Sequence, residues 1–392
     1  MQILYISQMC DGKTYKEIFT RKHKPMHAAN KYHTLLCEGL AKNDIKVNTF
    51  SVLPISKENC EKLYVSPKKI SNNNFTVEYI PVINLPVVKH LITFMGSFFK
   101  ALFAKKDTVL MCDVLTVSAS LGAIMGSKIT SKKSIGIITD LPKFQPIAKN
   151  KTMLMLNDLL MNMADGYVLL TKQMNQEVNL KNKPYIVLEG HVDAEMYHYH
   201  HSEFSKKVKK VLYAGSLRKI YGIKNLCEAF TKIYKPNEEL HIYGDGDYVP
   251  ELIELIKLNN QNIFFHGNCM NDEVIQAELD ATLLVNPRPT EGEYTKFSFP
   301  SKTLEYMVSG TPVLTAKLQG IPKEYEKYLY YFDDEDEDDL AFSLRKLLDS
   351  DLNIIKLKGQ QAREYVLREK NNVVQAKNII KLIEKLRRRK DI

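Results

Sequence analysis

The 392-residue sequence predicts an α/β protein with two doubly wound domains, and three observations support this prediction. Short runs of β-branched and aromatic residues alternate with longer helical stretches along the whole chain. Most of these runs are apolar throughout, which is typical of parallel strands that are covered by helices on both faces. The chain is also long enough for two such series, which a segment with little apolar periodicity separates.

The expected strands form two groups. Those of the first half cover residues 3–7, 46–53, 75–83, 108–114, 134–140, 166–171 and 184–188. Those of the second half cover residues 211–215, 240–244, 262–266, 281–286, 312–316 and 328–332. Right-handed crossovers through the intervening helices would make each sheet parallel. We expect the hinge between the domains in residues 189–210, which are rich in His, Ser and Lys.

The predicted N-terminal domain covers residues 1–195, and the predicted C-terminal domain covers residues 205–370. The last helix, at about 371–392, is expected to return to the N-terminal domain. Doubly wound domains bind ligands at the carboxyl ends of their strands. Two such domains that face each other would therefore form a cleft with ligand-binding loops on both walls.

The composition excludes several classes of protein. With 44% hydrophobic and 26% charged residues, the chain is neither a coiled coil, nor collagen, nor disordered. The longest run without a charged residue, 114–127, is too short for a transmembrane helix, which needs about twenty residues. The start, MQILYISQ, predicts a strand rather than a signal peptide, and the six cysteines form no CxxC pair. We therefore expect a cytoplasmic protein with buried thiols.

The positive charge belongs to the first half of the chain. Residues 1–195 contain 25 Lys and Arg against 16 Asp and Glu, whereas the remaining residues contain 30 of each kind. This asymmetry indicates an anionic partner for the N-terminal domain, such as a phosphate-bearing substrate, an acidic lipid surface or nucleic acid. Nucleic acid has the least support, because the lysines are scattered and no nucleic-acid-binding motif accompanies them.

The most informative segment is 286–314, NPRPTEGEYTKFSFPSKTLEYMVSGTPVL. It follows an expected strand and enters a helix whose first turn contains Pro300, Ser301, Lys302 and Thr303. Proline suits the first turn of a helix, and free N–H groups beside two hydroxyls and a lysine form a good seat for a diphosphate. On spacing alone, a capped crossover helix with a surface lysine is an equally good interpretation.

This segment resembles the donor-site loop and helix of the family-4 retaining glycosyltransferases, which have the GT-B fold. In that family, two glutamates separated by seven residues are followed by an apolar helix and a Gly-x-Pro-Val strand. Glu305 and the following residues match the second half of this pattern, whereas Phe297 occupies the position of the first glutamate. The sequence FSFPSK resembles the corresponding segment in a branch of the family that contains bacterial polysaccharide and lipid-glycan enzymes. The resemblance implies that Glu305 binds the ribose, and Glu291 or Glu293 are candidates to replace the missing acid.

The resemblance extends, in loose motifs with a consistent order, over about 300 residues. Residues 211–230, VLYAGSLRKIYGIKNLCEAF, resemble the strand, glycine turn and helix that open the C-terminal domain of the family. Ser216 and Tyr221 occupy the positions where many members have Arg and Lys. Arg218 and Lys219 are therefore the expected cations of the diphosphate clamp, and two solvated loop charges are the alternative.

The predicted site residues follow from this resemblance. The expected catalytic residues are Arg218, Lys219, Asp140 and Glu305. The expected donor-binding residues are Gly215, Ser216, Leu217, Gly244, Met270, Phe299, Pro300, Ser301, Lys302, Thr303 and Glu305. Asp140 lies in ITDLP, where many members have a histidine in the cleft. It is expected to contact the donor sugar or to assist the acceptor, and a helix N-cap is the alternative.

Two apparent metal motifs have simpler explanations. Asp245-Gly246-Asp247 is formally a DxD sequence, but it lies in the expected Gly-x-Gly turn, and a tight turn explains it better. His198, His200 and His201 lie on one hinge segment without a partner cluster, which is more typical of a solvated linker than of a zinc site. We expect no metal site.

Residues 85–106, LPVVKHLITFMGSFFKALFAKK, predict a basic helix with many apolar and aromatic residues. A crossover helix with its apolar face in the core is the favoured interpretation. Its lysines and phenylalanines also suit a helix at the surface of an anionic membrane. These residues are Lys89, Lys100, Lys105, Lys106, Phe94, Phe98, Phe99 and Phe103.

The sequence thus predicts a metal-independent glycosyltransferase without a cofactor that moves a sugar from a nucleotide-diphosphate sugar to a hydroxyl acceptor. The resemblance implies retention of configuration and a glycan or lipid-linked glycan as acceptor. Cations and helix N–H groups would stabilise the leaving diphosphate. We expect a cytoplasmic protein, with peripheral contact at the inner face of the membrane and no nucleic-acid partner.

Two alternatives remain open. A non-catalytic GT-B partner subunit would explain why Ser216, Tyr221 and Phe297 occupy positions that are usually charged. A sugar-nucleotide epimerase can use the same two-domain cleft, but it needs a pair of acid and base residues that the sequence does not show.

Overall fold

The computed structural model describes residues 1–19, 27–57, 59–71, 75–199, 208–259, 262–333 and 337–388. The chain divides into two compact units. Unit 1 comprises Met1–His191 together with Asn372–Ile392, and unit 2 comprises Val192–Asn371. Among the described residues, no helix combines the length and the apolar character that crossing a bilayer demands.

Unit 1 contains an eight-stranded sheet with the order β10-β9-β8-β7-β1-β2-β5-β4. Every neighbouring pair is parallel except β4 and β5. The strands are β1 Gln2–Ser7, β2 Lys46–Ser51, β4 Lys69–Ser71, β5 Thr76–Tyr79, β7 Thr108–Asp113, β8 Ser134–Ile138, β9 Gly166–Leu169 and β10 Tyr185–Val187. A separate antiparallel pair consists of β3 Tyr64–Val65 and β6 Val82–Ile83.

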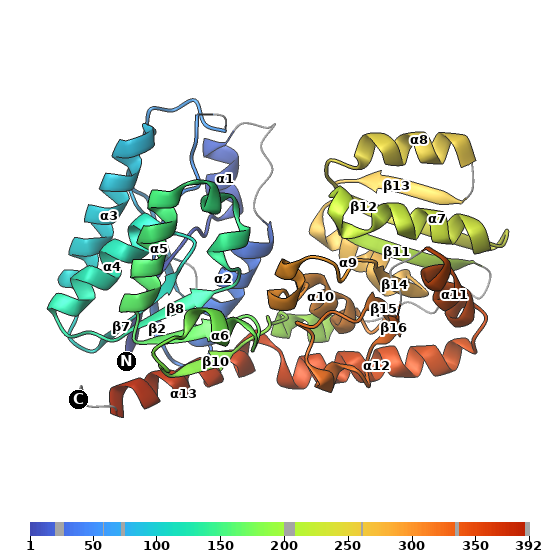
Figure 1. The fold of residues 1–392 in the computed structure, drawn as a ribbon. Helices are drawn as coiled ribbons and strands as arrows, with labels where there is room; N and C mark the ends of the chain where they lie inside the picture. The colour runs from blue at the N-terminus through green and yellow to red at the C-terminus, as the bar shows by residue number, and fades with distance from the viewer. Residues whose placement is uncertain are drawn as a thin grey trace. The chain divides into compact units, whose positions relative to one another are not determined.

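Helices cover this sheet, and Figure 1 shows α3 beside α4. The helices of unit 1 are α1 Gly12–Ile18, α2 His27–Ala41, α3 Pro86–Leu102, α4 Val117–Ile129, α5 Lys151–Met163, α6 Met174–Val178 and α13 Asn372–Arg388. Although α13 ends the described chain, it packs on α2, β9 and β10. Its residues Ile379, Leu382 and Ile383 belong to the same apolar core as β1 and β7.

Unit 2 contains a six-stranded parallel sheet with the order β13-β12-β11-β14-β15-β16. Its strands are β11 Lys209–Ser216, β12 Glu238–Asp245, β13 Ile263–Gly267, β14 Leu283–Asn286, β15 Val313–Ala316 and β16 Tyr330–Phe332. Counted from the first strand of the unit, this order is 3-2-1-4-5-6, which is the Rossmann order. The direction in which strands are added therefore reverses between β11 and β14.

The helices of unit 2 are α7 Ile223–Ile233, α8 Val249–Asn259, α9 Asn271–Asp280, α10 Ser301–Ser309, α11 Glu337–Leu348 and α12 Leu352–Glu369. The 3₁₀ turns of its described residues are η3 Ala194–His198, η4 Lys219–Tyr221, η5 Glu293–Phe297 and η6 Lys323–Tyr325. Apolar residues of α7 and α11 pack on β11, β12 and β14 to form the core.

The predicted α/β class with two doubly wound domains is confirmed, and each of the thirteen predicted strands has a counterpart in the described chain. The predicted strand 75–83 is interrupted, because the chain leaves the large sheet after β5 and β6 pairs with β3. Pro81, which lacks a backbone N–H, lies at this interruption. The short strands β3 and β4 were not predicted, since two or three residues show no periodicity. Of the expected hinge, residues 200–207 lie outside the described residues.

A buried polar cluster lies in unit 1. The Tyr5 hydroxyl is 2.7 Å from His33 Nδ1, and His33 Nε2 is 3.7 Å from Asp113 Oδ2. Nearby, His191 Nε2 donates to the Tyr32 carbonyl oxygen at 2.8 Å. Burial lowers the pKa of His33, and it lowers the pKa of His191 to about 4. Both imidazoles are therefore neutral at pH 7.

We predict that the free energy of unfolding falls as the pH is lowered from 7 to 5. The unfolded chain binds a proton at His191 with a pKa near 6.5, whereas the folded chain does so only near 4. The stabilisation is therefore present above about pH 6.5 and is lost as the pH falls towards 4. Between pH 7 and 5, this residue should contribute a loss of about 2 kcal/mol.

Chemical denaturation followed by circular dichroism at several pH values measures this loss. The variant His191→Gln keeps a donor for the Tyr32 carbonyl group but cannot titrate. Its pH dependence should be shallower than that of the parent by the same amount, and identical pH dependences would contradict the assignment.

Candidate ligand site in unit 2

The carboxyl ends of β11 and β14 are neighbours, because the two strands pair in parallel. Doubly wound sheets bind ligands beside the two strands at which the strand order reverses. In unit 2 these strands are β11, which ends at Ser216, and β14, which ends at Asn286. The loops that follow them, 217–222 and 287–300, therefore form the first place to look for a ligand site.

Glycines bring the loops at this edge into contact. Gly222 has a φ of +76°, and a β-carbon there would lie 2.0 Å from the Pro287 carbonyl oxygen. Gly244 has a φ of +128°, and a β-carbon there would lie 1.8 Å from the Gly215 carbonyl oxygen. A larger residue would clash at either position. The loops after β11 and β14 can approach each other because Gly222 carries no side chain, and the ends of β11 and β12 can lie this close because Gly244 carries none.

Helix α10 follows the β14 loop and is fixed to β11. It begins at Ser301, directly after Pro300, and ends at Gly310, which has a left-handed φ. The Tyr306 hydroxyl accepts from the Ala214 amide at 2.7 Å and donates to the Ala214 carbonyl oxygen at 3.0 Å. The exposed start of α10 presents backbone N–H groups, which favour an anionic ligand.

Lys302 lies between two acids. Its Nζ is 2.7 Å from Glu305 Oε2 and 3.9 Å from Glu278 Oε1, and the Glu278 side chain is buried. Burial by itself would lower the pKa of Lys302, but the carboxylates of Glu305 and Glu278 raise it above its ordinary value. Lys302 therefore stays charged and offsets part of the negative charge of these acids. Glu305, which remains partly exposed, is held in place by this ion pair.

Lys219, a predicted cation of the clamp, faces α8. Its Nζ is 2.5 Å from Glu251 Oε1, and the two side chains line a surface pocket formed with α8. The hydrogen bond to Glu251 raises the pKa of Lys219. The Lys219 amide donates to Asp247 Oδ1 at 2.8 Å. The charge of Lys219 is therefore already paired in this structure.

The acids of the DxD sequence belong to the turn after β12. Asp247 accepts from the Lys219 amide, and Asp245 Oδ1 accepts from the Gly246 amide at 2.8 Å. Within the ranges that the structure covers, no three His, Cys, Asp or Glu side chains are placed to hold a metal ion. His198 lies 3.6 Å from Glu195 Oε2, and His200 and His201 lie outside the described residues.

Arg218 and a second arginine lie over the ring of Tyr221. The Arg218 guanidinium carbon is 5.6 Å from the centre of this ring, and that of Arg288 is 5.0 Å from it. Arg288 is also 5.3 Å from the centre of the Tyr294 ring. Sequence reasoning missed Arg288, although a cation directly after the buried strand of the donor loop was a usable signal.

The other predicted donor-binding residues fall into two groups. Ser216, Ser301 and Met270 are exposed, and Gly215 and Gly244 are partly exposed. The buried group is Leu217, Phe299, Pro300 and Thr303. The Thr303 side chain is buried on α10, and its hydroxyl has no hydrogen-bond partner among the described residues, so its contact with a diphosphate stays a prediction. The other buried residues shape the loops rather than present side chains to a ligand.

Asp140 belongs to unit 1, where it is exposed after β8. The 3₁₀ turn that follows begins at Pro142, and its N-cap is Leu141, so the alternative of an N-cap at Asp140 is wrong. Phe297 is buried in η5, whereas Glu291 and Glu293 are exposed on the same loop.

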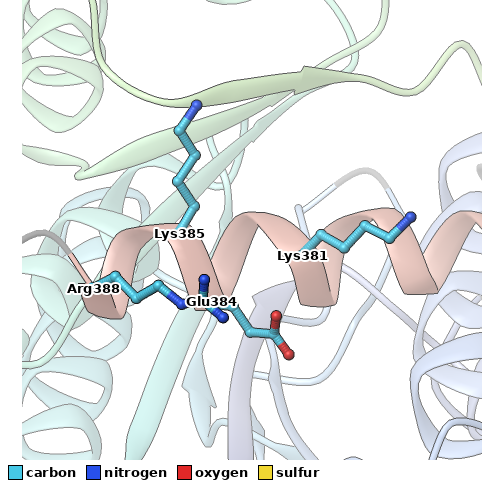
Figure 2. Close-up of a pocket in the computed structure, with 4 residues that line it drawn as sticks. All are labelled: Lys381, Glu384, Lys385 and Arg388. Atoms are coloured by element: carbon cyan, nitrogen blue, oxygen red, sulfur yellow. The ribbon is translucent and has the colours of Figure 1, made fainter.

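A further surface pocket lies on α13 in unit 1. Figure 2 shows its lining residues, which all come from this one helix, and Lys381 and Lys385 point in different directions. Glu384 and Arg388 complete the lining. The basic residues lie towards the end of the helix, where positive charge complements the helix dipole. Their divergent directions do not favour a binding site.

Comparison with known proteins shows which family model and which solved structures this chain resembles. Residues 208–350 match the family model described as Glycosyl transferases group 1, which covers little more than a third of the chain. No curated protein matches the sequence. The predicted enzyme class, glycosyltransferase, is confirmed.

Solved structures match the whole chain. A sucrose-phosphate synthase from Thermosynechococcus elongatus matches with a TM-score of 0.70 and 17% identity, over 98% of this chain and 99% of that chain. Anabaena HepE in complex with UDP matches with a TM-score of 0.69 and 15% identity, over 98% and 100%. The lipopolysaccharide outer core galactosyltransferase WaaB matches with a TM-score of 0.59 and 14% identity, over 98% and 99%. The predicted GT-B fold is confirmed.

Proposed function

We propose that this glycosyltransferase uses a nucleoside-diphosphate sugar as donor and binds it in unit 2. The supporting observation is that the two loops at the edge where the strand order reverses carry the exposed Arg218 and lead into α10, which has an exposed start at Ser301 and the partly exposed Glu305 carboxylate. These groups are complementary to a diphosphate and a ribose. The fold shared with HepE, which was solved with UDP, agrees with such a donor.

Each part of the site has a distinct role in this proposal. Glu305 accepts hydrogen bonds from the ribose hydroxyls, and the N–H groups at the start of α10 bind the diphosphate. Arg218 stabilises the charge that develops on the leaving diphosphate while a hydroxyl of the acceptor attacks the sugar. We place the enzyme in the FPSK branch of family 4, which implies a retaining, metal-independent reaction with a glycan or lipid-linked acceptor.

A panel of nucleotide sugars tests this function. The protein is incubated with each compound in the presence of EDTA, and the release of nucleoside diphosphate is measured. A transferase releases it slowly even to water and faster with an acceptor. Isomerisation of the sugar would instead indicate an epimerase, and no turnover of any compound would indicate a non-catalytic subunit. Activity that EDTA abolishes and Mn²⁺ restores would contradict metal independence.

We predict that Glu305→Ala weakens the binding of nucleoside diphosphate about ten- to hundred-fold, because one charge-assisted hydrogen bond contributes about 1.5–3 kcal/mol. The variant also loses the ion pair with Lys302. Both side chains of this pair are partly exposed, and alanine favours helices, so stability should change by only about 1 kcal/mol.

Isothermal titration calorimetry measures this binding. Glu364→Ala removes an exposed helical glutamate of the same unit and should leave the affinity unchanged. Equal affinities of Glu305→Ala and the parent would show that the ribose does not bind at Glu305.

We also propose that unit 1 contacts an anionic membrane through α3. Large apolar residues recur every fourth position on its outer side, with 40% to 80% of each side chain exposed: Val87, Leu91, Met95, Phe99 and Phe103. The inner side is made of small residues instead. There α4 packs so closely that a β-carbon on Gly122 would lie 2.2 Å from the Phe94 carbonyl oxygen. An exposed apolar stripe of this kind is typical of an interaction surface.

Charge near this stripe favours a lipid surface with negative headgroups. Lys105 and Lys106 are exposed just beyond the end of α3. Lys100 does not contribute a free charge, because its Nζ is 2.7 Å from Glu78 Oε2. Residues 1–195 as a whole also carry an excess of positive charge, which likewise favours a negatively charged surface.

We predict that the protein binds vesicles containing anionic lipid and that salt weakens this binding. Replacing Lys105 and Lys106 by Gln should reduce it about ten- to thirty-fold, since each lysine contributes about 1 kcal/mol. Replacing Leu91, Phe99 and Phe103 by Gln should abolish it. Vesicle co-sedimentation measures both effects.

The matched control is the pair Leu258→Gln and Phe342→Gln, which removes exposed apolar side chains from unit 2 and should have no effect. Equal binding to neutral and anionic vesicles, or no binding to either, would contradict the proposal.

A further inference from the structure

We infer that Arg288 and Arg218 form a two-arginine anion site, arranged around the ring of Tyr221, that binds the diphosphate of the donor. This inference rests on the proposed function and names the side chains that would hold the leaving group. In this site Arg288, which comes from a different loop, takes the role that the sequence had suggested for Lys219. The charge of Lys219 is already paired with Glu251.

The two arginines come from the two strands at which the strand order reverses. Arg218 lies just after β11, and Arg288 lies just after β14. The absence of a side chain at Gly222 lets the two loops approach each other at the Pro287 carbonyl group, directly beside these residues. Both guanidinium groups therefore lie on the edge at which doubly wound sheets bind their ligands.

The acidic residues of the described chain do not pair with either guanidinium group. Within the described part of the chain, no carboxylate lies within ion-pair distance of Arg218 or Arg288. Arg288 Nε is buried and has no hydrogen-bond partner there either. Two cations that share one aromatic ring repel each other, and a buried donor without an acceptor is costly. An anion that bridges the two groups would satisfy both.

A guanidinium group suits this position better than an ammonium group. The Arg288 guanidinium group lies near both the Tyr221 ring and the Tyr294 ring, which favours a cation at this position. A guanidinium group binds phosphate through two parallel hydrogen bonds, whereas an ammonium group acts as a point charge. Lysine at position 288 should therefore preserve the charge but lose part of the affinity.

Calorimetry with three probes tests this site. The probes are inorganic pyrophosphate, the nucleoside diphosphate that binds the parent most tightly, and the matching nucleoside. Arg288→Gln should weaken the binding of both diphosphates about ten- to hundred-fold and leave nucleoside binding unchanged. Arg288→Lys should weaken the binding of both diphosphates less. The matched control Arg368→Gln, which removes an exposed arginine paired with Glu369, should change none of these affinities.

The outcomes separate this inference from the function on which it rests. Diphosphate binding that survives Arg288→Gln would overturn the two-arginine site and leave the donor proposal standing. A parent protein that binds neither pyrophosphate nor any nucleoside diphosphate would overturn both. Arg288→Gln could also lower the melting temperature, and Arg288→Lys then provides the test. If Arg288→Lys binds both diphosphates as tightly as the parent, the bidentate contact is contradicted.

Discussion

The ligand edge of unit 2 depends on a steric constraint, because Gly222 approaches the Pro287 carbonyl group so closely that no side chain would fit there. This close approach lies between the loops that follow β11 and β14, the two strands at which the strand order reverses. Gly244 makes a second close contact, with Gly215, where the ends of the paired strands β12 and β11 lie side by side. Tyr306 completes the arrangement by fixing α10 to β11 through two hydrogen bonds. The position of every candidate ligand group depends on these backbone contacts.

Charges at this edge are separated into two sets. Lys302 on α10 pairs with Glu305 and lies near Glu278 of α9, which reduces the repulsion that these acids would exert on a nearby anion. Arg218 and Arg288 lie around Tyr221 without acidic partners in the described chain. One set therefore suits the hydroxyl groups of a ribose, and the other suits a diphosphate. A nucleoside-diphosphate sugar contains both a ribose and a diphosphate, so one donor can bind to the acids and to the arginines at once.

The sequence predicted the fold well, because buried parallel strands give short apolar runs that are recognisable without tertiary information. The donor loop was recognisable because its motif is contiguous, with Glu305 only three residues after Lys302. The roles of single cations were harder to predict. Lys219 is paired with Glu251 on a different helix, and Arg288 meets Tyr221 only after folding, so spacing along the chain shows neither contact. The burial of Thr303 was not predictable from the sequence either, because it depends on the direction from which α10 is packed.

A crystal structure of the protein with a bound nucleoside diphosphate tests the central claim most directly, which is that the donor binds where the strand order of unit 2 reverses. The result we expect is a diphosphate between the guanidinium groups of Arg218 and Arg288, with the ribose against Glu305. A nucleotide bound instead beside Lys219 and Glu251 on α8, or in unit 1, would contradict the claim.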